Sequence, residues 1–97
     1  MNIKPEHIER LKYLFENDKE HNVHLLDVVH GERVYQHVYL IEDVYGGQFS
    51  CHVDKTYYAL DVVEDNYSDS YYEFENCKKD FYQVVPKSIY EIRYVGV

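Results

Sequence analysis

The sequence predicts an α+β domain in which one N-terminal helix packs on an antiparallel sheet of five or six strands. Two observations favour this class: the apolar residues recur about every 3.6 positions up to residue 19, and about every 2 positions after it. A third is the length of 97 residues, which suits one domain, residues 1–97, with a single modest core.

The helix is predicted over residues 5–19. Pro5 suits a first helical turn, and Glu6 and Glu9 favour the positive N-terminal end of the helix dipole. The helix should end in the polar run "ENDKEHN". Its apolar stripe consists of Ile8, Leu11, Leu14 and Phe15.

The strands are predicted from alternating apolar and polar residues. A tight hairpin at Gly31-Glu32 should join the first two, and Gly46-Gly47 should end the second. The predicted strand segments are "NVHLLDVVH", "RVYQHVYLIED", "QFSCHV", "TYYALDVV", "SYYEFE", "FYQVV" and "SIYEIRYV", with Pro86 separating the last two.

The alternation also predicts which side chains face the core. Tyr58, Leu60 and Val62 should share one side of their strand. Cys51 should lie on the core face as a buried, inert thiol. A disulfide between Cys51 and Cys77 stays open on the sequence alone.

The composition indicates a folded protein that does not bind polyanions. Hydrophobic residues make up 45% of the chain, which is too many for a disordered chain even at a net charge of −8. Eighteen acidic against ten basic residues argue against nucleic acid and against anionic membranes as direct partners. The start resembles no signal peptide and no run is long and apolar enough to span a membrane, so we expect a cytoplasmic protein with reduced thiols.

No catalytic or metal-binding motif stands out. Cys51 and His52 are adjacent on a strand, so their side chains should point to opposite faces and share no proton. His21 and His24 have a ligand-like spacing, but no closely spaced cysteine pair accompanies them. We therefore expect no enzyme activity, no cofactor and no bound metal.

The negative charge is concentrated in the middle of the chain. Residues 42–75 contain nine acidic residues and one basic residue, Lys55, so this segment carries the whole net charge of −8. Within it, the segment 64–75, "EDNYSDSYYEFE", combines five carboxylates with four aromatic rings. Carboxylates beside tyrosines suit a protein interface, although a solvated face, or one neutralised by Lys78 or Lys79, would show the same pattern.

Strand alternation would place the acidic residues of this segment on one sheet face. A hairpin centred near Tyr67 would bring Asp61 across from Glu73, on the face opposite Leu60 and Phe74. The predicted partner-binding surface consists of Asp61, Glu64, Asp65, Tyr67, Asp69, Tyr71, Glu73 and Glu75.

In size, charge, tyrosine content and the "EDNYSDSYYEFE" segment, the chain resembles the small acidic proteins that phages use against host defence or DNA enzymes. These include anti-CRISPR proteins, anti-restriction DNA mimics and inhibitors of uracil-DNA glycosylase. The resemblance implies an inhibitor that occupies the basic nucleic-acid-binding groove of a host enzyme. An immunity protein or antitoxin that neutralises a basic toxin is one alternative, and a small ligand-binding domain or enzyme with a pocket under the helix is another.

Overall fold

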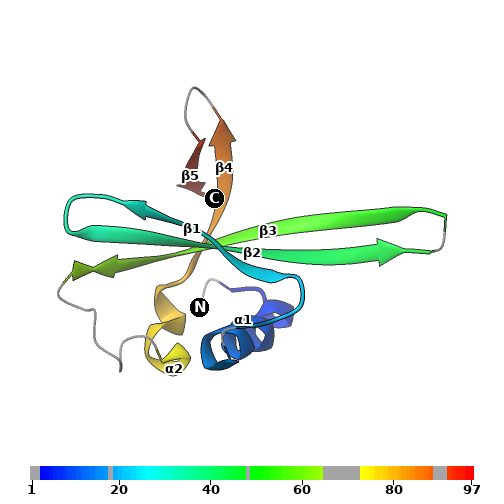
Figure 1. Cartoon of the computed structure of the whole chain (residues 1–97), viewed down its shortest axis with the longest axis horizontal. Helices are drawn as coiled ribbons and strands as arrows, with labels where there is room; N and C mark the ends of the chain where they lie inside the picture. Colours follow the sequence, from blue (N-terminus) through cyan, green and yellow to red (C-terminus); the bar gives the residue numbers. More distant parts are fainter. Residues whose placement is uncertain (1–2, 18, 48, 65–72, 89–91) are drawn as a thin grey trace.

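The computed structural model describes residues 3–17, 19–47, 49–64, 73–88 and 92–97. The predicted α+β fold is confirmed, because the N-terminal helix packs on a five-stranded antiparallel sheet whose strands lie side by side in chain order (Figure 1). The elements are α1 (Pro5–Asn17), β1 (Val23–His30), β2 (Val34–Gly46), β3 (Cys51–Val63), α2 (Phe74–Cys77), the 3₁₀ turn η2 (Lys78–Asp80), β4 (Tyr82–Ser88) and β5 (Ile92–Gly96). None of the helices in these ranges has the length and apolar character that a membrane crossing requires.

The main core lies between the sheet and the helices. Leu11 of α1 is fully buried, and the alternating residues Tyr58, Leu60 and Val62 of β3 face it as predicted. Four aromatic rings fill the space between α1, α2 and the sheet, with centroids 5.6–6.1 Å apart: Phe15, Tyr39, Phe74 and Phe81.

A second, smaller cluster lies on the other face of the sheet, which we call the outer face. Val38, Ala59 and Val84 are fully buried there, and the cluster includes no residue of α1 or α2 among the residues that the structure describes. Figure 1 shows α1 and α2 on one side of the long β2–β3 ribbon and the β4–β5 hairpin on the other side. The centre of the sheet is therefore buried on both faces.

The predicted strand "SYYEFE" is wrong over the residues that the structure describes. Residues 74–77 form α2, in which Phe74 and Cys77 are buried. These two positions are three residues apart, so they share one face of a helix but would lie on opposite faces of a strand. Burial of both against the helical side of the sheet favours the helix.

The connection between β1 and β2 is one residue longer than predicted. It contains Gly31, Glu32 and Arg33, and Arg33 has a φ of 63°. The Gly31 amide donates a hydrogen bond of 2.8 Å to the Val34 carbonyl, which closes the loop. A positive φ at the last loop residue is typical of hairpins longer than two residues.

The far halves of β2 and β3 form a two-stranded projection, which we call the arm and define as residues 42–46 and 51–55. Pairing with β1 ends at Ile41, and pairing with β4 begins at Tyr57. Figure 1 shows the arm extending away from the helices. The prediction of a buried Cys51 is therefore wrong: this thiol is exposed on the arm, and both Cys51 and Cys77 are free.

The arm's turn depends on Gly46. This residue has a φ of 107°, and a Cβ atom there would lie 2.0 Å from the Ser50 carbonyl oxygen. We expect Gly46→Ala to destabilise the arm by at least about 2 kcal/mol, because it combines a left-handed conformation with a backbone clash. Hydrogen exchange of the arm amides should accelerate accordingly.

Gly47→Ala is the matched control, since no atom lies within 4 Å of a Cβ built at Gly47. Equal exchange rates in the two variants would contradict this account of the turn.

Candidate functional site

A buried polar network fastens α1 to the base of the arm. His7 Nε2 donates a 2.8 Å hydrogen bond to Asp43 Oδ2, and His7 Nδ1 lies 2.8 Å from the Tyr58 hydroxyl. Arg10 binds the other oxygen of Asp43 and donates a 3.1 Å bond to the Glu42 carbonyl. His7 and Tyr58 are almost fully buried.

The surroundings of this network shift two pKa values. Burial alone would raise the pKa of Asp43, but the hydrogen bonds and positive charges of His7 and Arg10 hold it below its ordinary value. Burial raises the pKa of Tyr58, although a hydrogen bond from the Lys4 amide acts in the opposite direction.

The network has the residue types of a proton relay, but its geometry is structural. Tyr58 and His7 are 0% and 1% exposed, so neither offers a surface at which a substrate could react. Their contacts join residues 7 and 10 of α1 to residues 43 and 58 of the sheet. We assign the network to positioning the helix against the sheet.

This network was not predicted from the sequence. The available signal was His7, which precedes Leu11 by four positions and so continues the apolar stripe of the helix. Asp43 gave a second signal, since it has the same strand parity as the buried Ile41. His7 on the apolar face of the helix and Asp43 on the core-facing side of its strand could thus have been expected to pair, because a buried polar group needs a hydrogen-bonding partner.

The structure separates the predicted acidic surface. Asp61 lies on the outer face opposite Gln36, rather than across from Glu73. Glu64 follows β3 and forms an ion pair of 3.6 Å with Arg33. Glu73 and Glu75 belong to the α2 region on the helical side. The other predicted residues, Asp65, Tyr67, Asp69 and Tyr71, lie outside the described residues.

Much of the excess negative charge has a partner in the fold. Glu75 bonds Lys78 at 2.7 Å, and this bond and charge lower the pKa of Glu75. Two acids pair with exposed histidines: Glu42 lies 3.2 Å from His24 Nε2, and Asp54 lies 2.7 Å from His52 Nε2. Lys78, with Arg33 beside Glu64 and Arg10 beside Asp43, therefore makes the middle segment less uniformly negative than its sequence suggests.

The outer face places carboxylates next to tyrosines. The Tyr82 hydroxyl donates a 2.9 Å hydrogen bond to Asp61, and it accepts one of 2.9 Å from the Gln36 amide. Burial raises the pKa of Tyr82; the bond from Gln36 opposes this shift, and the bond to Asp61 adds to it. The rings of Tyr57 and Tyr94 pack 6.1 Å apart.

Asp27 of β1 completes this group, which we call the outer tyrosine face: Asp27, Tyr57, Asp61, Tyr82 and Tyr94. Burial raises the pKa of Tyr94, and the nearby charge of Asp27 raises it further. The three tyrosines are partly buried around the outer cluster. The face therefore combines two carboxylates with three aromatic rings around the outer cluster.

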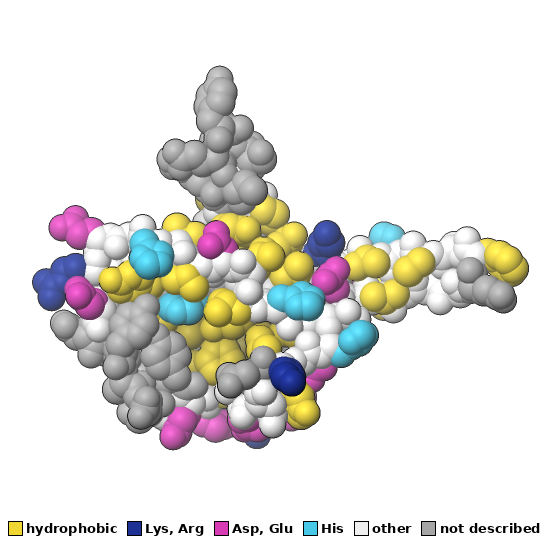
Figure 2. All heavy atoms as spheres, in the orientation of Figure 1, with side chains coloured by type: hydrophobic (Ala, Val, Ile, Leu, Met, Phe, Trp, Pro, Cys, Tyr) yellow, Lys and Arg dark blue, Asp and Glu magenta, His cyan; other side chains and the backbone are white. Residues whose placement is uncertain are grey.

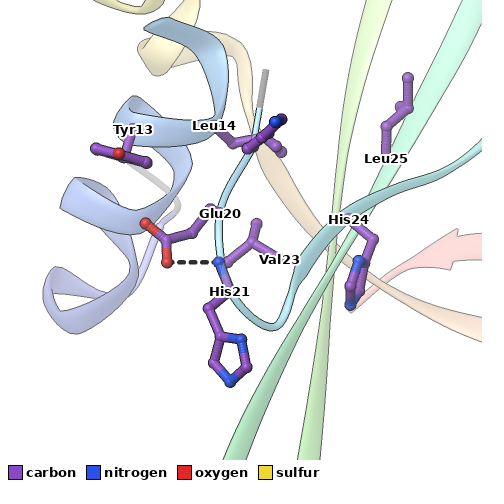
Figure 3. Close-up of a pocket in the computed structure, with 8 residues that line it drawn as sticks. Tyr13, Leu14, Glu20, His21, Val23, His24 and Leu25 are labelled. Carbon is purple, nitrogen blue, oxygen red and sulfur yellow. Dashed lines mark hydrogen bonds between the residues drawn. The ribbon is translucent and has the colours of Figure 1, made fainter. Parts of the chain in front are cut away.

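A shallow hollow of about 760 Å³ opens between the end of α1 and β1. Figure 3 shows Tyr13, Leu14 and Glu20 on one side of it and Val23, His24 and Leu25 on the other. Among its lining residues, the His21 amide donates a 2.7 Å hydrogen bond to Glu20 Oε1. Among the described residues, no three histidine, cysteine or acidic side chains lie close enough together to hold a metal ion. His21 and His24 therefore have no third ligand beside them in this part of the chain.

Cys77 is the buried thiol of the chain. Burial, aided by the negative charge of Asp80, raises the pKa of Cys77 to about 11. A thiol with this pKa is almost entirely protonated at neutral pH, so it is a poor nucleophile.

Comparison of the chain with protein-family models, with curated protein sequences and with solved structures finds no match.

Proposed function

We propose that the protein is a small acidic inhibitor that binds the basic nucleic-acid-binding groove of a target enzyme through the outer tyrosine face. The observation that supports this proposal is the setting of Asp27 and Asp61 beside Tyr94 and Tyr82, on a sheet face that neither α1 nor α2 covers. Carboxylates attract a groove that binds phosphates, and partly buried tyrosines supply rigid contact area.

The charge of the whole molecule supports the same class of partner. A net charge of −8 on 97 residues accelerates association with a basic protein by long-range attraction. Both cysteines are free thiols, which suits a reducing compartment. We place the protein in the cytoplasm, the host cytoplasm if a phage encodes it, with a nucleic-acid enzyme as its partner.

The proposal is tested by competition with labelled duplex DNA on three enzymes: a CRISPR nuclease, a restriction endonuclease and a uracil-DNA glycosylase. We expect the protein to displace DNA from at least one of them, with an association rate that falls as salt rises, because added ions screen the charges. No displacement from any of the three would contradict the proposal.

A pair of double variants locates the surface. Asp27→Asn with Asp61→Asn should weaken binding by at least about tenfold, or roughly 1.4 kcal/mol, because two carboxylates are lost from the interface. Glu9→Gln with Glu16→Gln removes the same charge from exposed positions on α1, and it should cost less than about twofold. Equal losses would mean that the charge acts only at long range.

A further inference from the structure

The arm lacks the neighbours that stabilise a sheet. In the described part of the chain, residues 43–46 and 51–55 pair only with each other, whereas Glu42 still donates its amide to the Asn22 carbonyl and accepts a bond from Arg10. The β3 strand of the arm therefore has a free edge over residues 51–55, and the β2 strand has one beyond Glu42. An isolated two-stranded ribbon is at best marginally stable in water, and a free edge readily accepts another strand. The arm is therefore suited to pairing with a further strand.

The arm also exposes large apolar side chains. Val44 and Val53 lie opposite each other and are 55% and 40% exposed, and Tyr45 is 53% exposed. Phe49, in the connecting turn, is 96% exposed. Figure 2 shows hydrophobic side chains along the visible side of the arm, far from the helices. An exposed apolar strip beside a free edge is a feature of association surfaces.

The sequence of the β3 edge is complementary to itself. Residues 51–55 read Cys-His-Val-Asp-Lys, with Val53 at the centre. If two such strands pair antiparallel around Val53, each His52 faces the other copy's Asp54, and each Cys51 faces the other copy's Lys55. The contact between His52 and Asp54, 2.7 Å within one chain, shows that the two groups bind each other.

The β2 edge lacks this complementarity. Antiparallel pairing around Val44 would place Asp43 opposite Tyr45 of the other copy, with no opposite charge to meet the carboxylate. Asp43 is in addition held by His7 and Arg10 of its own chain. The β3 edge is thus the better match for a second copy.

We propose that the protein forms a two-fold symmetric dimer in which the β3 edges of two arms pair antiparallel around Val53. The two arms then form a continuous four-stranded sheet, and the four valines of the two copies, Val44 and Val53 of each, line one face of it. An interface of two five-residue strands is small, so the dimer is weak and concentration-dependent. This inference is independent of the proposed function and leaves the outer tyrosine face of each copy available.

The effect of salt distinguishes the proposed dimer from binding to a basic enzyme. Each copy carries a net charge of −8, so the copies repel each other at long range, while a basic partner is attracted. Added salt should therefore strengthen the dimer and weaken binding to a basic enzyme. Sedimentation velocity of the protein alone, over a range of concentrations and salt, measures the first effect; a protein that stays monomeric at millimolar concentration overturns the proposal.

Disulfide trapping tests the register. In the proposed pairing, the two Val53 Cα atoms lie about 4.5–5.5 Å apart, within disulfide range. Val53→Cys in a Cys51→Ser background should therefore form a covalent dimer rapidly on mild oxidation. The two Cys51 residues of the unchanged protein are offset by four positions, about 13 Å along the strand, so the unchanged protein should crosslink at least tenfold more slowly.

Val44→Cys in the same Cys51→Ser background is the matched control, because it places a thiol of similar exposure on the other arm strand. It should also crosslink at least tenfold more slowly than the Val53 variant. Equal rates for the two variants, or rapid crosslinking through Cys51, would overturn the proposed pairing.

Charge reversal provides a second test without a thiol. His52→Asp places an acid opposite the other copy's Asp54 and should abolish the dimer, since like charges directly opposite destabilise a strand pair. Adding Asp54→Lys to this variant restores opposite charges and should restore the dimer. Failure of the double variant to recover, with circular dichroism showing an intact fold, would count against pairing through this edge.

Discussion

Replacing Phe81 with alanine should remove about 3–5 kcal/mol from the free energy of unfolding. Phe81 is fully buried, and its ring packs 5.7 Å from that of Phe15, 5.6 Å from Tyr39 and 6.1 Å from Phe74. It thereby joins α1, α2 and the sheet in one cluster. Truncation leaves a cavity among these rings, which cannot collapse without moving a helix.

A loss of this size is large for a small domain, whose total stability is typically about 5–15 kcal/mol. For a chain of this length, each kilocalorie corresponds to about 4–8 °C in Tm, so we expect Tm to fall by more than about 12 °C. Urea unfolding followed by circular dichroism provides the free energy directly.

Phe49→Ala is the matched control, because it makes the same chemical change at a ring that is 96% exposed in the turn of the arm. It should leave stability within about 0.5 kcal/mol of the unchanged protein. If Phe81→Ala behaved in the same way, the aromatic cluster could not be what holds the helices on the sheet.

Local patterns in the sequence were sufficient to predict the helix and the central strands. The apolar stripe of α1 and the alternation of Tyr58, Leu60 and Val62 each identify one face that must be buried, and the structure buries those faces. Periodicity works here because each element has one clearly apolar side against the same core.

The pattern failed where burial depends on a distant neighbour. Cys51 was predicted to face the core from the alternation of its own short segment, but along the continuous strand β3 it shares the parity of Ala59 on the outer face, not that of Tyr58, Leu60 and Val62. Parity also indicates only a face of the strand, and not whether another element covers it. The arm extends beyond β1 and β4, so nothing in the described structure covers Cys51. The α2 helix was missed because a four-residue helix with Phe74 and Cys77 buried is too short to show a period.

For the same reason, the structure places Asp61 apart from Glu73 and Glu75, with which it was predicted to form one surface. Asp61 is on an outer sheet face, as expected, but the tyrosine that bonds it, Tyr82, comes from β4, and Tyr94 of β5 lies near Asp27 instead. Strand pairing between distant segments brings them together, and no spacing within 64–75 could indicate it. Glu73 lies immediately before α2, and therefore on the helical side of the sheet, opposite the outer face.

Removing the carboxylate of Asp43 should cost about 2–4 kcal/mol of stability at neutral pH. Asp43→Ala would leave the buried His7 without its 2.8 Å partner and Arg10 without its counter-charge. The cost exceeds that of an ordinary surface pair because Asp43 is only 23% and His7 only 2% exposed at their side chains. Loss of the contact also frees the base of the arm from α1.

The pH dependence of this effect has a definite sign. The pKa of Asp43 is lower in the folded protein than its ordinary value of 3.8, so the folded state binds the proton more weakly than the unfolded state. The stabilisation is therefore complete above about pH 5 and is lost as the pH falls through the folded-state pKa. The difference in unfolding free energy between the unchanged protein and Asp43→Asn should shrink over that acidic range.

Asp54→Ala is the control for this prediction, because Asp54 is the cross-strand neighbour of Asp43 and also bonds a histidine. Its partner His52 is 73% exposed at its side chain, and Asp54 itself is 55% exposed. Water replaces such a contact at little cost, so Asp54→Ala should lose less than about 1 kcal/mol. Equal losses from the two aspartates, or a difference that stays constant down to pH 2, would show that burial against α1 does not strengthen the Asp43 network.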